Sequence, residues 1–542
     1  MDTQVAIIGG GPCGLLSSLL LARQGIRNVV FEKHPDISFH PKAMGVTRRT
    51  AEIYRQLGIL DRMREKDLPS GIHAVQIWLR SFAGEEFGRS PLVEVDESLT
   101  PCGRIHCPQP HTEAVLKEAV EREEFSEIRF HTRVESLEDS GDGVTVSFRD
   151  PSSGDIRTLR AQWAVAADGA ASPIREKLGI ETRGPGDRGH FLNVYFRADY
   201  GKHLKGRESV LYSLLDDESY EFFVAVNGRD EWLMHHFLQA GESAADYSPA
   251  MFQDIIRGVS GLPDVPVEVI SVSPWVMSPK VATRWRAGRI FLTGDAAARL
   301  SPAGGLGMNT GLQSAFNLAW KLALVLKGQA AESLLDTYER ERLGVVKFIF
   351  ENAEGNADEV FQIVGAAMTG HWDVAKEKIR HSRRGGSGAG VDLGPAYGEG
   401  GALVPDDTDP PSPPDPVNDY VPTARPGHRA PHLAIRGGNG ETSTLDLFGK
   451  DFVLLCGPDG GFRREAFTTG AGGPAKAPRP GVVVAGESFR TDMEAFLDLY
   501  GISADGAVLV RPDGYVAARW PDGKAGHEDD GVEKALADIL GL

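Results

Sequence analysis

Cysteine is scarce in this sequence, and no two cysteines are spaced as a redox or metal-binding pair. The 542 residues include four cysteines, Cys13, Cys102, Cys107 and Cys456, and none belongs to a CxxC motif. Their spacing indicates neither a disulfide framework nor a zinc ribbon. We therefore expect no metal site and a protein that works in the reducing cytoplasm.

Positive charge and long apolar runs are also limited. The 58 lysine and arginine residues are outnumbered by 76 aspartate and glutamate residues, and this net charge of -18 opposes binding to nucleic acid phosphates. No uninterrupted apolar run reaches the roughly 18 to 20 residues needed to cross a bilayer. The composition, 41% hydrophobic and 25% charged, is typical of folded globular proteins. We expect a soluble protein of two or three domains, with no nucleic acid or membrane partner.

The hydrophobic pattern changes along the chain and predicts a discontinuous first domain. Apolar runs alternate with helical patterns up to about residue 182, which indicates βαβ units, and this character returns at residue 286. The stretch between has short strand-like runs, which predict an antiparallel sheet. We predict these parts: 1–182 with 286–395, a doubly wound α/β domain; 183–285, a middle domain with a possible contribution from 70–105; 396–432, a proline-rich linker; and 433–542, a third domain.

A glycine-rich motif between an apolar strand and a helix predicts a dinucleotide site. Gly9, Gly11 and Gly14 match GxGxxG, and Pro12 lies where the helix begins. The three glycines permit a tight turn, an approach to pyrophosphate and close helix packing, while the helix N-terminus attracts negative charge. Glu32 ends the next strand, where it can accept from ribose hydroxyls. Lys33 is included in the predicted site only because it adjoins Glu32.

Two later motifs resemble those of the class A FAD-dependent aromatic hydroxylases. Asp168 opens Asp-Gly-Ala-Ala-Ser-Pro-Ile-Arg, which matches the family pattern DGxxSxxR, and residues 294–297 read Gly-Asp-Ala-Ala before a glycine-rich loop that ends at Gly311. The resemblance implies an α/β fold with a Rossmann-like FAD-binding domain, an antiparallel-sheet substrate domain and a C-terminal thioredoxin-like domain. The third domain has no CxxC, so we expect it to have a structural or oligomerisation role, with a homodimer as the candidate assembly.

The same resemblance implies which residues hold FAD. A carboxylate such as Asp295 can accept from ribityl hydroxyls, and the helix that begins near Met308 favours negative charge on reduced flavin. The further residues that the resemblance places at FAD are Lys42, Gln109, Val134, Asp168, Pro302, Gly305, Gly307 and Asn309. Lys42 stands where many relatives have arginine, and Ala298 where many have histidine. The lysine keeps the charge but loses the planar fork, and the alanine leaves no imidazole.

The resemblance implies an aromatic-ring monooxygenase, closest to hydroxylases of polycyclic natural products such as aromatic polyketides and indolocarbazoles. NADPH or NADH would reduce FAD, O2 would add as a flavin C4a-hydroperoxide, and one oxygen would pass to an electron-rich ring. FAD carries this chemistry, so we name no catalytic residue of the protein. Baeyer-Villiger insertion into a polycyclic ketone, and an FAD protein that sequesters a reactive intermediate, remain open alternatives. The substrate pocket is expected between Phe191 and Trp275.

Overall fold

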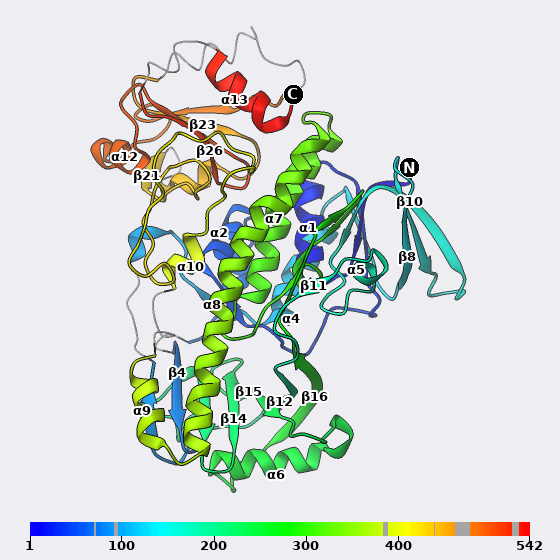
Figure 1. Cartoon of the computed structure of the whole chain (residues 1–542), viewed down its shortest axis with the longest axis vertical. Coiled ribbons are helices and arrows are strands. Elements are labelled where there is room, and N and C mark those ends of the chain that lie inside the picture. Colours follow the sequence, from blue (N-terminus) through cyan, green and yellow to red (C-terminus); the bar gives the residue numbers. More distant parts are fainter. Residues whose placement is uncertain (70–71, 91–95, 383–387, 438–439, 461–476, 523–529) are drawn as a thin grey trace.

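Three regions follow one another along the long axis of the molecule. The computed structural model describes residues 1–542 except 70–71, 91–95, 383–387, 438–439, 461–476 and 523–529. The N-terminal α/β region lies in the middle of the view, the sheet of residues 189–277 lies below it, and the C-terminal region lies above it (Figure 1). This arrangement confirms the predicted α/β fold class. None of the described helices is both long and apolar enough to span a membrane.

The central sheet of the N-terminal region is parallel at its core. Its strand order is β18-β19-β10-β1-β2-β7, and every pair between β19 and β7 is parallel. The whole of β2 is buried, as expected for a strand covered on both faces. The strands are β1 (Thr3–Ile8), β2 (Asn28–Phe31), β7 (Ser126–Arg129), β8 (Val134–Asp139), β9 (Val144–Arg149), β10 (Ile156–Ala166), β18 (Arg286–Ala287) and β19 (Ile290–Leu292).

Strand β19 comes from residues far along the chain and makes this region discontinuous. It pairs with β10 and leads through a loop into α7 (Gly307–Leu326), which packs against α1 (Pro12–Arg23). The other helices and short strands of this region are α2 (Arg48–Gln56), α3 (Leu60–Arg64), α4 (Gln109–Glu121), α5 (Pro173–Lys177), α10 (Ala389–Leu393), β3 (Gly45–Val46), β6 (Ile105–His106), β11 (Thr182–Arg183), β17 (Lys280–Ala282) and β20 (Ala298–Arg299).

A seven-stranded sheet forms the middle region, in the order β16-β12-β15-β14-β13-β4-β5. It is not wholly antiparallel, because β13 pairs with β4 in parallel. Its last two strands come from the 70–105 stretch, of which residues 70–71 and 91–95 lie outside the described part. The strands are β4 (His73–Leu79), β5 (Glu86–Arg89), β12 (Gly189–Arg197), β13 (Ser209–Leu215), β14 (Tyr220–Ala225), β15 (Glu231–Phe237) and β16 (Glu268–Met277).

Helices cover the middle sheet on both faces. Helix α6 (Pro249–Ser260) packs on one face through Phe252 and Ile256, where they join a core with Phe223 and Met234. The lower half of α8 (Asp336–Met368) lies on the other side, next to α9 (Trp372–Arg380) (Figure 1). Helix α8 therefore runs from the N-terminal region to the middle region and contacts both.

The C-terminal region has a four-stranded sheet, in the order β24-β23-β25-β26. Residues 394–433, which lead into it, form no helix or strand, yet Ala402, Ala424 and Arg429 within them are buried. This stretch is therefore packed against its neighbours. The elements are β21 (Ala434–Gly437), β22 (Gly440–Ser443), β23 (Val453–Cys456), β24 (Gly481–Val484), β25 (Ala507–Val510), β26 (Val516–Trp520), α12 (Met493–Tyr500) and α13 (Asp530–Leu540).

Candidate active site

A large cavity lies between the N-terminal region and the middle sheet. Its volume is ≈ 1560 Å³. One wall consists of loops at the carboxyl ends of the parallel strands, which is where open α/β sheets bind ligands. The opposite wall is one face of the middle sheet, with part of α8 at the side. The cavity is therefore built by segments that are far apart in the sequence.

The glycines of the first motif are needed for different reasons. Gly9 has φ +108, and a Cβ there would lie 2.2 Å from the carbonyl oxygen of Ala167. A Cβ on Gly14 would lie 1.9 Å from the carbonyl oxygen of Gly9, so close packing of α1 requires glycine. A Cβ on Gly11 would meet nothing within 4 Å. Gly11 and Pro12 line the cavity at the N-terminus of α1, where backbone N–H groups favour an anion.

Glu32 is bonded to the backbone of two loops. Its Oε2 accepts a hydrogen bond from the Gly10 N–H at 2.7 Å, and its Oε1 accepts one from the His34 N–H at 2.8 Å. The carboxylate therefore shapes the turn that follows β1, and further lone pairs are left for a ribose. Lys33 is exposed and does not line the cavity.

Asp168 organises its own loop. Its two carboxylate oxygens accept from the Ser172 hydroxyl at 2.7 Å and the Ile174 N–H at 3.2 Å. Burial raises the pKa of Asp168, although these hydrogen bonds act in the opposite direction. Gly169 and Ala170 of the same loop line the cavity, whereas the Asp168 side chain does not. Asp168 is thus placed to hold the loop in shape.

Arg175 joins this loop to the Gly-Asp-Ala-Ala segment. Its guanidinium donates to the carbonyl oxygens of Ala170 and Ala171, and at 3.1 Å to that of Ala296. Because Arg175 is buried, these carbonyl groups satisfy a charged group that would otherwise be costly to bury. The two family motifs are therefore held together by one side chain.

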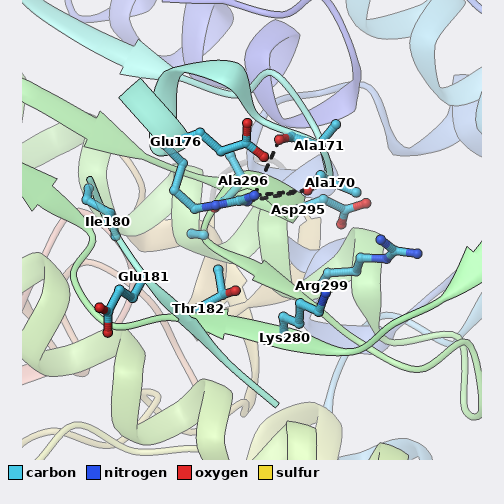
Figure 2. Close-up of a pocket in the computed structure, with 12 residues that line it drawn as sticks. Ala170, Ala171, Glu176, Ile180, Glu181, Thr182, Lys280, Asp295, Ala296 and Arg299 are labelled. Atoms are coloured by element: carbon cyan, nitrogen blue, oxygen red, sulfur yellow. Dashed lines mark hydrogen bonds between the residues drawn. The ribbon is translucent and has the colours of Figure 1, made fainter. Parts of the chain in front are cut away.

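Asp295 lies between two cavities. It lines the large cavity and also a smaller one of ≈ 390 Å³, where Figure 2 shows its side chain near Arg299. Burial raises the pKa of Asp295, while the nearby cations Arg299 and Lys42 counteract the effect. Arg299 and Lys280 line the smaller cavity, and Ala298 is buried in β20. Ala298, the position where the resemblance implies a histidine in many family members, therefore contributes a packed methyl group.

The glycine-rich loop before α7 lines the large cavity through Pro302, Gly305, Gly307 and Met308. Gly305 has φ +67, which glycine adopts without strain. Asn309 is buried behind the loop, and its amide bonds to the backbone of Gly45, Thr47 and Gly305. Asn309 therefore shapes the cavity indirectly, because it holds together two loops that line it.

Three further residues that the resemblance assigned to FAD lie in different surroundings. Lys42 and Gln109 line the cavity. Gln109 donates through its amide to Glu113 Oε1 at 2.7 Å, which fixes its orientation. Val134 begins β8 and packs at the edge of the N-terminal core, outside the cavity lining.

Sequence reasoning missed the part of the cavity wall that α8 provides. Phe191 and Trp275, which bound the predicted pocket, do line the cavity. The predicted range omits the side chains of α8, which recur at helical spacing. This helical spacing could have indicated an apolar helix face toward the cavity, but the same spacing is equally typical of ordinary core helices. These wall residues are Ala357, Val360, Phe361, Val364 and Met368.

Comparisons with known proteins match the whole chain. The family model for an FAD binding domain matches residues 2–353, and the model for the C-terminal part of aromatic-ring hydroxylases matches residues 423–542. Tetracenomycin A2 monooxygenase-dioxygenase of Streptomyces glaucescens is 34% identical, and the alignment covers 100% of this chain and 98% of that protein. The chain is 35% identical to 4-methyl-5-nitrocatechol 5-monooxygenase of a Burkholderia species, and the alignment covers 100% of this chain and 97% of that protein.

A solved structure is similar over the same extent. The flavin-dependent monooxygenase PieE, in complex with FAD and substrate, superposes with a TM-score of 0.92. Its identity to this chain is 31%, and the match covers 100% of this chain and 99% of that one.

Proposed function

Since the chain belongs to the FAD-dependent aromatic-ring hydroxylases, we propose that it inserts one oxygen atom from O2 into a polycyclic aromatic natural product. FAD is its cofactor, with NADPH or NADH as the reductant of this family. Named relatives act on substrates of different size, including a nitrocatechol and a tetracenomycin. The substrate class of this chain must therefore be argued from its own cavity.

The proposal of a polycyclic substrate rests on the size of the cavity. Its ≈ 1560 Å³ exceeds the roughly 300–1,000 Å³ of a pocket for one drug-sized ligand, so it has room for FAD and a fused ring system together. The wall away from the nucleotide loops is rich in aromatic and apolar side chains, namely Phe191, Val210, Leu211, Phe222, Val224, Leu233, Phe237 and Trp275. Such a wall suits a flat, apolar ligand.

The residues present fit FAD. The open face of Gly11 lets a pyrophosphate approach the N-terminus of α1, and Glu32 directly follows β2, where the ribose is expected. Asp295 offers a carboxylate to the ribityl chain, and α7 begins beside the Gly305 loop. When bound, the flavin takes electrons from NAD(P)H and delivers one oxygen atom from O2 to the ring.

The protein's own contribution is to position the flavin and the substrate and to exclude water from the site. Asn309 and Arg175 fix the loops that face the flavin, while the sheet and α8 enclose the substrate. The N-terminus of α7 carries a partial positive charge, which favours negative charge on the reduced flavin ring. An apolar wall keeps water from the reacting oxygen and so limits wasteful oxidation of NAD(P)H.

Purified protein tests this proposal directly. We expect a yellow protein that retains FAD and oxidises NADPH or NADH faster when a polycyclic phenol is added. Labelled oxygen from O2 should appear in the product as a new ring hydroxyl group. Gly14→Ala serves as the matched control, because the cofactor site should not form in it.

Other outcomes would overturn the proposal in recognisable ways. An oxygen inserted between ring carbons would identify a Baeyer-Villiger enzyme. Tight binding of polycyclic ligands without turnover would indicate sequestration. A colourless protein that does not bind added FAD at micromolar concentration would exclude all three.

A further inference from the structure

The cavity face of the middle sheet carries a row of polar residues next to a row of aromatic residues. In the strand register, Asn193 lies opposite both His235 and Ser273, and His235 lies opposite Phe222. Cross-strand partners share a face, so Ser273, Asn193 and His235 form a row. The adjacent row on one side is Trp275, Phe191 and Phe237. The row on the other side is Ser271, Tyr195, Leu233, Val224, Leu211 and Gln76, and its polar side chains are hydrogen-bonded within the protein.

His235 is the member of this row with a ring in the cavity wall. It lies with its ring centroid 5.6 Å from Phe222 and 5.9 Å from Trp275. Neither of its nitrogens forms a hydrogen bond within the part of the chain that the structure describes. The Oδ1 of buried Asn193 also has no partner there. Polar groups left unpaired in apolar surroundings cost free energy, so a ligand with a matching polar group is expected.

His236, the next residue in β15, lies in surroundings that differ from those of His235. His236 points to the opposite face of the sheet, as expected for successive residues of a strand. Its Nδ1 lies 2.6 Å from Glu221 Oε1, and its ring packs against Tyr247 and Phe252. Both histidines are among the residues that line the cavity, but the Nδ1 of His236 is paired with Glu221 and only its Nε2 lacks a partner among the described residues, whereas neither nitrogen of His235 is paired there.

The charge state of His235 limits what it can bind. Burial, with a smaller effect of nearby His40, lowers the pKa of His235 to about 4. The ring is therefore neutral at neutral pH, and a neutral imidazole has one nitrogen that accepts a hydrogen bond and one that donates. A hydroxyl group suits the acceptor nitrogen, whereas a carboxylate would find no positive charge on this ring.

We propose that His235 accepts a hydrogen bond from a phenolic hydroxyl group of the substrate and so selects rings that carry a hydroxyl over the middle of the sheet. This inference rests on the proposed function and specifies its substrate class. Phe191 and Trp275 stack with centroids 4.7 Å apart at 14°, and they form an apolar border for the rest of the ring system. The hydrogen bond also enriches the ring in electrons at the ortho and para carbons, where an electrophilic oxygen adds.

Ligand binding to the FAD-loaded protein provides the test. The probes are a monohydroxylated anthraquinone and its methyl ether, which lacks the donor, and the readout is the dissociation constant from the change in flavin absorbance. The wild type should bind the phenol about 5- to 10-fold more tightly than the ether, the value of one neutral hydrogen bond. His235→Phe should abolish this preference, and His235→Gln should keep part of it.

His190→Phe is the matched control, because His190 is an exposed residue of β12 that alternates away from the cavity-facing Phe191. This variant should keep the full preference. The inference is overturned if the wild type does not distinguish the two probes, or binds neither. It is also overturned if His235→Phe keeps the preference.

Turnover separates this inference from the proposed function. Incorporation of labelled oxygen into a phenol, with an unchanged preference in His235→Phe, would leave the function standing and exclude the role of His235. A preference that depends on His235, without oxygen incorporation into any phenol, would support the binding role and exclude the function.

Discussion

The Asn309 side chain holds the backbone of Thr47 across the cavity edge. Its Oδ1 accepts a hydrogen bond from the Thr47 N–H at 2.9 Å, and its Nδ2 donates to the carbonyl oxygens of Gly45 and Gly305, each at 2.9 Å. One buried amide thus joins the loop before α2 to the first turn of α7. Both loops line the cavity, so their spacing depends on this residue.

Removing this amide should weaken both the fold and the cofactor site. Asn309→Ala leaves one backbone N–H and two carbonyl groups without their partner, and an unsatisfied buried group costs about 1–3 kcal/mol. We expect a lower free energy of unfolding in urea and at least about tenfold weaker FAD binding. Gln362→Ala removes an exposed amide on α8 and should change the stability by no more than about 0.5 kcal/mol. Wild-type affinity in Asn309→Ala would contradict this role.

Two glycines of the first motif should respond differently to the same change. Gly11→Ala has room for its Cβ and an ordinary φ of -74, so the apoprotein should keep its melting temperature. The new methyl group would occupy the approach of the pyrophosphate, and FAD binding should weaken at least about tenfold. Gly14→Ala should instead destabilise the apoprotein, because its Cβ would collide with the backbone of Gly9. Thermal unfolding and FAD titration of both variants would check this. Equal behaviour would contradict the assignment.

A buried ion network should dock the C-terminal region. Arg511 donates to Glu341 of α8 at 2.7 Å and also pairs with Asp513, while Lys321 of α7 lies 2.6 Å from Glu341. Breaking a buried pair costs about 3–5 kcal/mol, which we expect for Arg511→Met in urea unfolding. Arg436→Met removes an exposed pair with Glu441 and should cost less than about 1 kcal/mol. Similar losses in both variants would exclude a special role for the network.

The same network predicts how stability depends on pH. Burial alone would raise the pKa of Glu341, but Arg511 and Lys321 outweigh it and hold the pKa well below its usual value. A carboxyl whose pKa is lower in the folded state stabilises the protein above its unfolded pKa, and this contribution is lost as the pH falls through the folded value. The stability difference between wild type and Glu341→Gln should therefore stay constant between about pH 7 and pH 5.5 and shrink as the pH falls below the unfolded pKa of about 4.5. Urea unfolding at each pH measures it, and a difference that stays constant below that pKa as well would contradict the prediction.

Helix α8 should limit the size of the substrate. Val364 lines the cavity wall, so Val364→Trp should fill space there without touching the nucleotide loops. We expect normal FAD content, with affinity for a polycyclic phenol reduced at least about tenfold and affinity for a single-ring phenol reduced less. Val374→Trp on α9, where the side chain is 48% exposed, is the matched control. Unchanged polycyclic affinity in Val364→Trp would mean that the substrate lies elsewhere.

Local sequence determined much of the nucleotide region. The apolar run before Gly9 and the spacing of the three glycines predict β1, the tight turn and α1, because each depends on neighbouring residues. The α/β class and the C-terminal sheet followed in the same way from strand and helix periods. The parallel pairing of β13 with β4 did not, because strands more than a hundred residues apart leave no local sign of their register.

The cavity was decided by tertiary structure. Asp295 and Gly305 were identifiable from their motifs, but the roles of Asn309 and Arg175 appear only when distant loops meet, since their partners are backbone atoms that any sequence supplies. The wall that α8 adds and the row around His235 depend on how a helix and a sheet pack. The sequence alone determined which cofactor chemistry the chain supports, because that requires local turns. Only the packing of the sheet and α8 decided the size and polarity of the substrate site, because these arise between segments far apart in the chain.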